Sequence, residues 1–153
     1  MHTQIIKKQL IKTDIDNLWH FMSSPKNLDM ITPKEMKFNI KSNNGNKKMY
    51  EGMIITCTVT PLLNIPLNWI TEITHIKKNK YFVDEQRVGP YKMWHHEHIF
   101  EQKEDGILMT DIITYVPPMG VLGKIANFLF INKKVNRIFD YRKKIIDQLF
   151  NRK

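Results

Sequence analysis

Three histidines, a tryptophan and a glutamate occupy five consecutive positions within the stretch GPYKMWHHEHIF, residues 89–100. Imidazoles bind metals, shuttle protons or donate hydrogen bonds, so the chemistry of this stretch depends on which side chains share a face. Residues two apart in a strand lie on the same face. The sequence therefore predicts that Trp94, His96 and His98 act together, and that His95 and Glu97 form a solvated pair on the other face.

The same alternation in the two flanking stretches places acidic and aromatic residues beside these histidines. The aromatic ends favour burial, which assigns these residues to the inner, concave face of a sheet: Phe82, Asp84, Gln86, Trp94, His96, His98, Phe100, Asp111, Ile113 and Tyr115. Ionisable groups are costly to bury unless they are paired, so we expect Asp–His hydrogen bonds that raise the imidazole pKa. Two interpretations stay open: the polar wall of a ligand pocket, or a closed network that fixes the register of the strands.

Other chemistries are weaker interpretations of the same residues. His96 and His98 with Asp84 or Asp111 could form a two-histidine, one-carboxylate metal site, but no further histidine is near on this face, and we expect neither a metal nor a cofactor. Cys57 lies in the middle of a strand, which predicts a buried thiol rather than a nucleophile. General acid–base chemistry is the remaining catalytic option, and its candidates are His96, His98, Asp84 and Asp111.

The rest of the chain predicts the elements that hold these residues. Residues 2–12 resemble an edge strand, a helix begins at Thr13 or Asp14, and a second short helix begins at Ser23 or Ser24 and ends before Pro33. From residue 36 the period changes to two, which predicts strands at 36–40, 48–62, 65–76, 80–89, 91–102 and 106–118, with a polar turn at 42–48.

Residues 120–150 have the periodicity of one long helix with a bend at Asn132. Its apolar stripe comprises Val121, Ile125, Phe128, Val135, Phe139 and Ile146, and its charged side carries Lys133, Lys134, Arg137 and Lys144.

Composition limits the class of protein. The 153 residues are 42% hydrophobic with a mean hydropathy of −0.40, which is typical of one globular domain over 1–153. No apolar run approaches the ~20 residues of a membrane span, and the N-terminal residues lack the apolar region of a signal peptide. The single cysteine excludes an intramolecular disulfide and suits a reducing compartment, so we expect a cytoplasmic protein.

The net charge of +9 is concentrated near the C-terminus, where residues 119–153 hold nine basic and two acidic side chains. Twenty lysines against four arginines indicate a general compositional bias. Arginines and aromatics interleaved for phosphate and base recognition are scarce, so we expect no nucleic-acid partner. Stable membrane association is not expected either, while weak binding of the basic C-terminal helix to an anionic surface stays open.

The order strand, two short helices, six strands and long helix gives these elements a family resemblance. The stretches FVDEQRVGPYKMWHHEHIFE, LMTDIITYVPPMGVLGKIANFLF and RIFDYRKK resemble small bacterial proteins of the START/birch-pollen-allergen-like (SRPBCC) superfamily, including polyketide cyclase or dehydrase-like domains. This resemblance implies an α+β helix-grip fold: a curved antiparallel sheet of about seven strands around a long C-terminal helix, with a cavity between them. The superfamily contains carriers, receptors and enzymes, so the fold does not settle the activity.

We therefore predict a protein that binds a small or medium hydrophobic or amphipathic molecule with a polar end between the sheet and the helix. The predicted lining residues are Trp69, Phe82, Asp84, Gln86, Trp94, His96, His98, Asp111, Ile113, Tyr115, Ile125 and Leu129. The alternative is a cyclase, dehydratase or isomerase that uses His/Asp acid–base chemistry in the same cavity. The sequence favours binding and leaves enzyme activity undecided.

Overall fold

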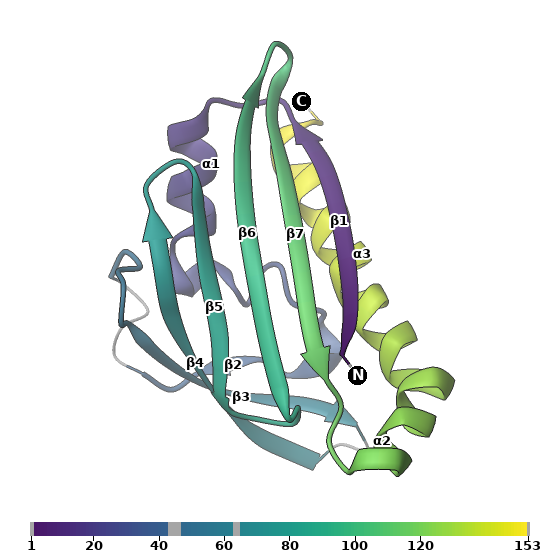
Figure 1. The fold of residues 1–153 in the computed structure, drawn as a ribbon. Coiled ribbons are helices and arrows are strands. Elements are labelled where there is room, and N and C mark those ends of the chain that lie inside the picture. The colour runs from purple at the N-terminus through teal and green to yellow at the C-terminus, as the bar shows by residue number, and fades with distance from the viewer. Residues whose placement is uncertain (1, 43–46, 63–64, 153) are drawn as a thin grey trace.

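A single antiparallel sheet brings the first strand of the chain against the last. The computed structural model describes residues 2–42, 47–62 and 65–152. The strands are β1 (Thr3–Ile11), β2 (Asn39–Ile40), β3 (Ile54–Leu62), β4 (Ile65–Lys77), β5 (Tyr81–Val88), β6 (Met93–Lys103) and β7 (Gly106–Val116). Their order across the sheet is β1-β7-β6-β5-β4-β3-β2, and the sheet curves so that β3 and β4 turn away from the direction of β6 and β7 (Figure 1).

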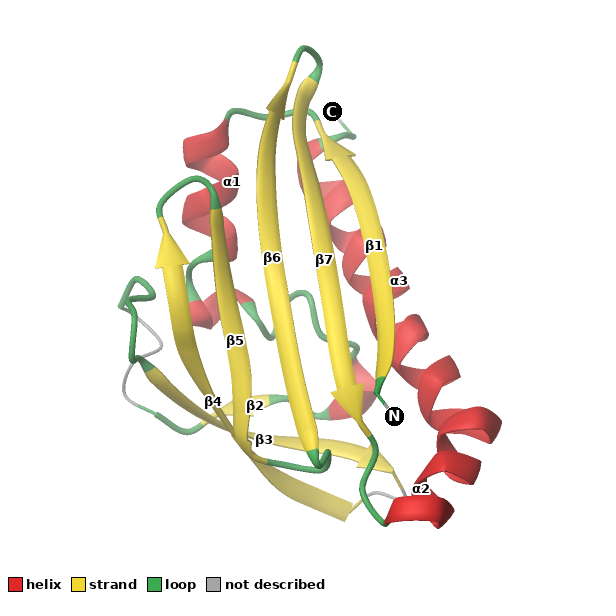
Figure 2. Cartoon of the chain, in the orientation of Figure 1, coloured by secondary structure: helices red, strands yellow, loops and turns green. Residues whose placement is uncertain are grey.

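The helices lie on one side of this sheet (Figure 2). Between β1 and β2 the chain forms α1 (Ile15–Met22) and two short 3-10 turns, η1 (Pro25–Asn27) and η2 (Lys34–Met36). After β7 it forms α2 (Gly120–Ala126), the π-helical turn η3 (Asn127–Ile131) and α3 (Asn132–Phe150). The predicted helix-grip architecture is confirmed. None of the described helices is long and apolar enough to cross a lipid bilayer.

Local chemistry explains where these elements begin and turn. Asp14 caps α1 by accepting a 2.8 Å hydrogen bond from the Asn17 backbone N–H, and Leu18, Trp19 and Met22 then face the core at helical spacing. Gly106 begins β7 with a φ of 140°, and a Cβ there would lie 2.3 Å from the Ile11 carbonyl oxygen. Only glycine fits the close approach of this turn to the end of β1.

Three expectations about the elements need correction. The second short helix is only the single turn η1, and the strand predicted at 36–40 shrinks to β2 because Met36 ends η2 and Lys37 takes a left-handed conformation, with a φ of 45°. β3 begins at Ile54 rather than at residue 48. Most of the turn predicted at 42–48 lies outside the described residues.

The long C-terminal helix is also interrupted as predicted, but with a consequence for its faces. The π-helical turn η3 ends immediately before Asn132, and it shifts the faces of the helix that follows. In α3 the predicted stripe is buried at Val135, Phe139 and Ile146. In α2 and η3 the stripe is wrong, because Val121, Ile125 and Phe128 are exposed.

Strand register brings the ionisable residues together. Asp84 on β5 pairs with His96 on β6, and His98 on β6 pairs with Asp111 on β7. Burial alternates along β6, where Trp94, His96, His98 and Phe100 are buried and the residues between them are not. The predicted assignment of the histidines to the inner face therefore holds.

Candidate functional site

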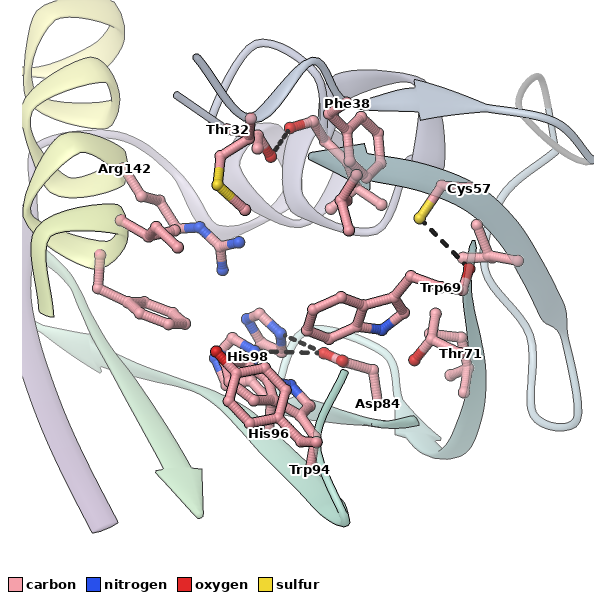
Figure 3. Close-up of a pocket in the computed structure, with 18 of the residues that line it drawn as sticks. Thr32, Phe38, Cys57, Trp69, Thr71, Asp84, Trp94, His96, His98 and Arg142 are labelled. Atoms are coloured by element: carbon pink, nitrogen blue, oxygen red, sulfur yellow. Dashed lines mark hydrogen bonds and ion pairs between the residues drawn. The ribbon is translucent and has the colours of Figure 1, made fainter. Parts of the chain in front are cut away.

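A cavity of about 140 Å³ lies between the curved sheet and α3, and its walls are largely aromatic (Figure 3). Trp69, Tyr91 and Trp94 form one side, with the Trp69 and Trp94 rings 5.3 Å apart at 86°. Phe82 and Phe139 contribute further rings. A cavity of roughly this volume admits a benzene ring, whereas typical sites for larger ligands begin near ~300 Å³. The cavity therefore suits one ring or a short aliphatic chain.

Two carboxylates and two imidazoles form a closed four-residue network, the Asp/His tetrad, at one wall. His96 Nε2 lies 3.0 Å from Asp111 Oδ1, and His98 Nε2 lies 2.9 Å from Asp84 Oδ2. Each Nδ1 faces the other carboxylate at ion-pair distance: 3.3 Å from His96 to Asp84 and 3.0 Å from His98 to Asp111. The contact between His98 Nδ1 and Asp111 is an ion-pair contact without a hydrogen bond, since His98 Nδ1 has no hydrogen-bond partner within the described chain.

Neighbouring rings fix the orientation of both imidazoles. Phe82 stacks on His98 with ring centroids 4.0 Å apart, and the His96 and His98 rings are 3.7 Å apart. Phe139 approaches His96 edge-on at 5.0 Å. Because rotation of either imidazole would break ring contacts as well as ion pairs, the tetrad is a rigid part of the wall.

The tetrad also shifts the pKa values of its members. Burial alone would raise the pKa of Asp84 and Asp111, but the charges and hydrogen bonds of His96 and His98 outweigh burial and hold both pKa values well below the ordinary range. Burial alone would lower the pKa of His96, but the charge of Asp84 and hydrogen bonds to Asp111 and Asp84 raise it. Asp84 and Asp111 are thus ionised at neutral pH, and His96 keeps its proton to higher pH than a free imidazole.

Asp84, His96 and His98 are also the described residues that could hold a metal ion. They offer three ligand atoms within 4.8 Å of one another, and all three line the cavity. A divalent cation would have to displace protons from imidazole nitrogens that face carboxylates, so its binding would be coupled to proton release.

Opposite the tetrad, α3 places a guanidinium against the cavity. Figure 3 shows Arg142 extending from the helix toward the histidines, and its guanidinium lies 4.7 Å over the Phe139 ring. Its Nε and Nη1 are buried without a hydrogen-bond partner in the described structure. Lys134, two turns earlier, also lines the cavity. Neither cation forms an ion pair with a described residue, so the helix side of the cavity carries two cationic groups without a directly paired acid.

Six of the twelve predicted lining residues lie in the cavity wall: Trp69, Phe82, Asp84, Trp94, His96 and His98. Asp111 is in the tetrad but sits behind the histidines, and Ile113 and Tyr115 are fully buried in the core. Gln86 instead holds the β5–β6 turn, where it donates to the Tyr91 carbonyl oxygen at 2.7 Å.

The helix residues Ile125 and Leu129 are also absent from the cavity wall. They are 53% and 64% exposed, because α2 and η3 turn this face to solvent.

Several residues of the cavity wall are not predicted from the sequence. Strict alternation from His96 puts Tyr91 on the other face, but β6 begins only at Met93, and Tyr91 belongs to the turn before it. Phe139 is predicted only as a core residue, but it also lines the cavity. Lys134 is predicted on the charged face of the helix, and this is wrong because it lines the cavity as well. The available signal is spacing: Lys134, Ile138 and Arg142 recur every four residues and therefore share one face of α3.

Cys57 lines the cavity as an unreactive thiol. It is buried and donates to the Trp69 carbonyl oxygen at 3.4 Å. Burial raises its pKa to about 12. Since the thiolate is the nucleophilic form, this cysteine contributes apolar wall rather than covalent chemistry.

Solved structures share this architecture over nearly the whole chain. The ginseng (Panax ginseng) major latex-like protein 151 is 14% identical with a TM-score of 0.69, and the match covers 97% of both chains. Protein CV1439 from Chromobacterium violaceum is 7% identical with a TM-score of 0.74 over 96% of both chains. Protein TTHA0849 from Thermus thermophilus is 11% identical with a TM-score of 0.72 over 95% of both chains.

No protein-family model and no curated protein sequence matches the chain. The similarity is therefore one of structure, and at these identities it shows the fold alone. Ara h 8.0201, at a TM-score of 0.60, is a further protein of the same shape. The chain has the helix-grip fold of START/birch-pollen-allergen-like proteins.

Proposed function

We propose that the cavity binds a small hydrophobic molecule with an anionic end and releases it unchanged. The observation that carries this proposal is the Arg142 guanidinium, which faces an aromatic cavity with Nε and Nη1 unpartnered. A buried donor left without an acceptor costs ~1–3 kcal/mol, and more when it is charged. A ligand carboxylate would reduce that cost by accepting a charge-assisted hydrogen bond from the guanidinium.

Charge in the cavity wall supports an anion rather than a neutral or cationic end. The two carboxylates of the tetrad lie within ion-pair distance of the imidazoles, on the sheet side of the cavity. Lys134 and Arg142 place two cationic groups on the helix side of the cavity, which favours an anionic end over a neutral or cationic one. His96 and His98 are among the lining residues predicted from the sequence, but their ring nitrogens face the two carboxylates of the tetrad. In this proposal Arg142 is therefore the main contact of the polar end.

The test is a titration followed by tryptophan fluorescence, since Trp69 and Trp94 line the cavity. Benzoate, benzyl alcohol and benzylamine are probes of similar size that are anionic, neutral and cationic, respectively, at neutral pH. We expect benzoate to bind most tightly. Arg142→Met, which keeps an apolar stem, should weaken benzoate binding by roughly ten- to hundredfold, the equivalent of one charged hydrogen bond.

Arg137→Met is the matched control, because it removes the same charge from an exposed position of α3. It should leave all three affinities unchanged, and circular dichroism should show that both variants fold. Failure of all three probes to bind would contradict the proposal. So would an equal preference for benzoate in wild type and Arg142→Met.

An acid–base enzyme is the second candidate, and one observation favours it. His96 lines the cavity and its raised pKa keeps it protonated to higher pH, so it could act as a general acid if its ring left one of its two carboxylate contacts. Native mass spectrometry of the protein purified without added ligand separates the two functions. A co-purified organic acid that is recovered unchanged after incubation supports binding, whereas a product of altered mass that disappears in His96→Ala supports catalysis.

A further inference from the structure

The solvent-exposed face of α2 and η3 is apolar. A surface helix normally exposes polar side chains and buries its apolar face. Val121, Leu122, Ile125, Phe128 and Leu129 recur at the i, i+1, i+4, i+7 and i+8 positions of one stripe, and all are exposed. Phe128 is 88% exposed, the largest exposure among the large hydrophobic residues of the described chain. The apolar tip is defined here as the exposed hydrophobic side chains of this segment: Met119, Val121, Leu122, Ile125, Phe128, Leu129 and Phe130.

The opposite face of the same segment anchors it to the protein. Gly123 is buried so closely against Pro118 that a Cβ would lie 1.6 Å from its carbonyl oxygen. Asn127 accepts a 2.8 Å hydrogen bond from the Tyr115 hydroxyl and donates at 3.0 Å to Thr3 Oγ1. These contacts hold the side of α2 and η3 that carries Gly123 and Asn127 against the protein, so the apolar side of the same segment faces water. Figure 1 shows α2 at one end of the molecule, beyond the end of β7.

The charges around the apolar tip are of one sign. Lys124, Lys133 and Arg137 are exposed and lie within or just after it in the sequence, and no acidic residue occurs from 112 to 139. A second copy of the chain would bring these cations against one another, which disfavours self-association through this face. A surface that is apolar inside and anionic outside satisfies both features at once.

We propose that the apolar tip is a docking surface for anionic lipid membranes, with its hydrophobic side chains in the headgroup–acyl boundary and the lysines against lipid phosphates. The stripe of α2 and η3 would lie in the plane of the interface, and the sheet and cavity would remain in water. This inference is independent of the ligand cavity: docking can succeed where cavity binding fails, and the reverse.

Flotation with vesicles of phosphatidylcholine, with and without phosphatidylglycerol, tests the inference. Wild type should float with the anionic vesicles and much less with neutral ones, and added salt should weaken the binding. Leu122→Ser combined with Phe128→Ser should lower partitioning by roughly tenfold or more, because apolar area drives interfacial binding. Lys133→Glu combined with Arg137→Glu should lower partitioning to anionic vesicles selectively.

The matched control places the same kind of substitution on exposed apolar residues of the sheet. Ile6→Ser combined with Val88→Ser, at positions 54% and 52% exposed, should leave vesicle binding unchanged. Thermal unfolding verifies that each variant folds. Wild type that stays with the unbound fraction would overturn the inference. So would equal binding of the tip variant, or light scattering that shows a dimer which the tip variant dissociates.

Discussion

At the scale of residues, the tetrad combines two ionised carboxylates with two imidazoles in a closed arrangement. Each carboxylate contacts both rings, so loss of one group leaves a buried charge without its partner. Removal of one member of a buried ion pair costs ~3–5 kcal/mol. The tetrad is therefore both a wall of the cavity and a strong constraint on the register of β5, β6 and β7.

The tetrad predicts how stability depends on pH. The raised pKa of His96 stabilises the fold fully below the unfolded pKa of ~6.5, and this contribution is lost as pH rises through the folded value. The lowered pKa values of Asp84 and Asp111 stabilise the fold above ~3.9, and that contribution is lost as pH falls. The free energy of unfolding, measured in urea, should be highest between about pH 4 and 6.5.

Asp111→Asn should lower that maximum and flatten the loss at higher pH, because His96 no longer has a charged partner at Nε2. Glu104→Gln, an exposed turn carboxylate, is the control and should reproduce the wild-type curve. A wild-type curve that keeps rising above pH 7 would contradict the assigned charges.

Strand alternation predicts which residues form the tetrad, but the sequence does not show which residues of the C-terminal helix face the cavity. A strand period of two puts His96 and His98 on one face, and the same alternation predicts Asp84 and Asp111 there, while their exact pairing depends on the strand register. The face of a long helix depends on where it crosses the sheet. From the sequence alone, Lys134 and Arg142 therefore look like solvent-exposed charges, although both line the cavity. Gln86 looks like a residue of the cavity wall, although its side chain hydrogen-bonds within the β5–β6 turn.

At the scale of elements, α3 carries the contacts that hold the helix on the sheet. Val135, Phe139 and Ile146 are buried on one face, and Lys7 on β1 pairs with Asp140 at 2.8 Å on the rim. The π-helical turn separates this packed helix from α2, whose apolar side chains point to solvent. The same apolar periodicity therefore gives a buried face in α3 and an exposed face in α2 and η3. From the sequence the two look like one continuous core stripe.

Substitution along α3 should distinguish core from surface. Ile146→Ala should lower the free energy of unfolding by about 2–5 kcal/mol, because the side chain is fully buried and its removal leaves a cavity. Leu149→Ala is the control at 47% exposure and should change stability by no more than about 0.5 kcal/mol. Equal effects from the two substitutions, measured by urea unfolding, would show that α3 packs with a different face.

At the scale of the whole molecule, two surfaces of opposite character meet the environment. The cavity is narrow, aromatic and positively charged on its helix side, while the apolar tip is open and flanked by lysines. Both place positive charge beside apolar surface, and both depend on the C-terminal helix for it. The helix-grip fold fixes the position of these features, and in the two proposals Arg142, Lys134 and the tip residues would select what they bind.

A crystal structure of the protein with benzoate bound tests the central claim most directly. The proposal predicts the benzoate ring inside the cavity, against the Trp69 and Trp94 side of its wall, and the carboxylate accepting a hydrogen bond from the Arg142 guanidinium. Benzoate bound with its carboxylate against another group while Arg142 points away would contradict it, as would a ligand found only outside the cavity.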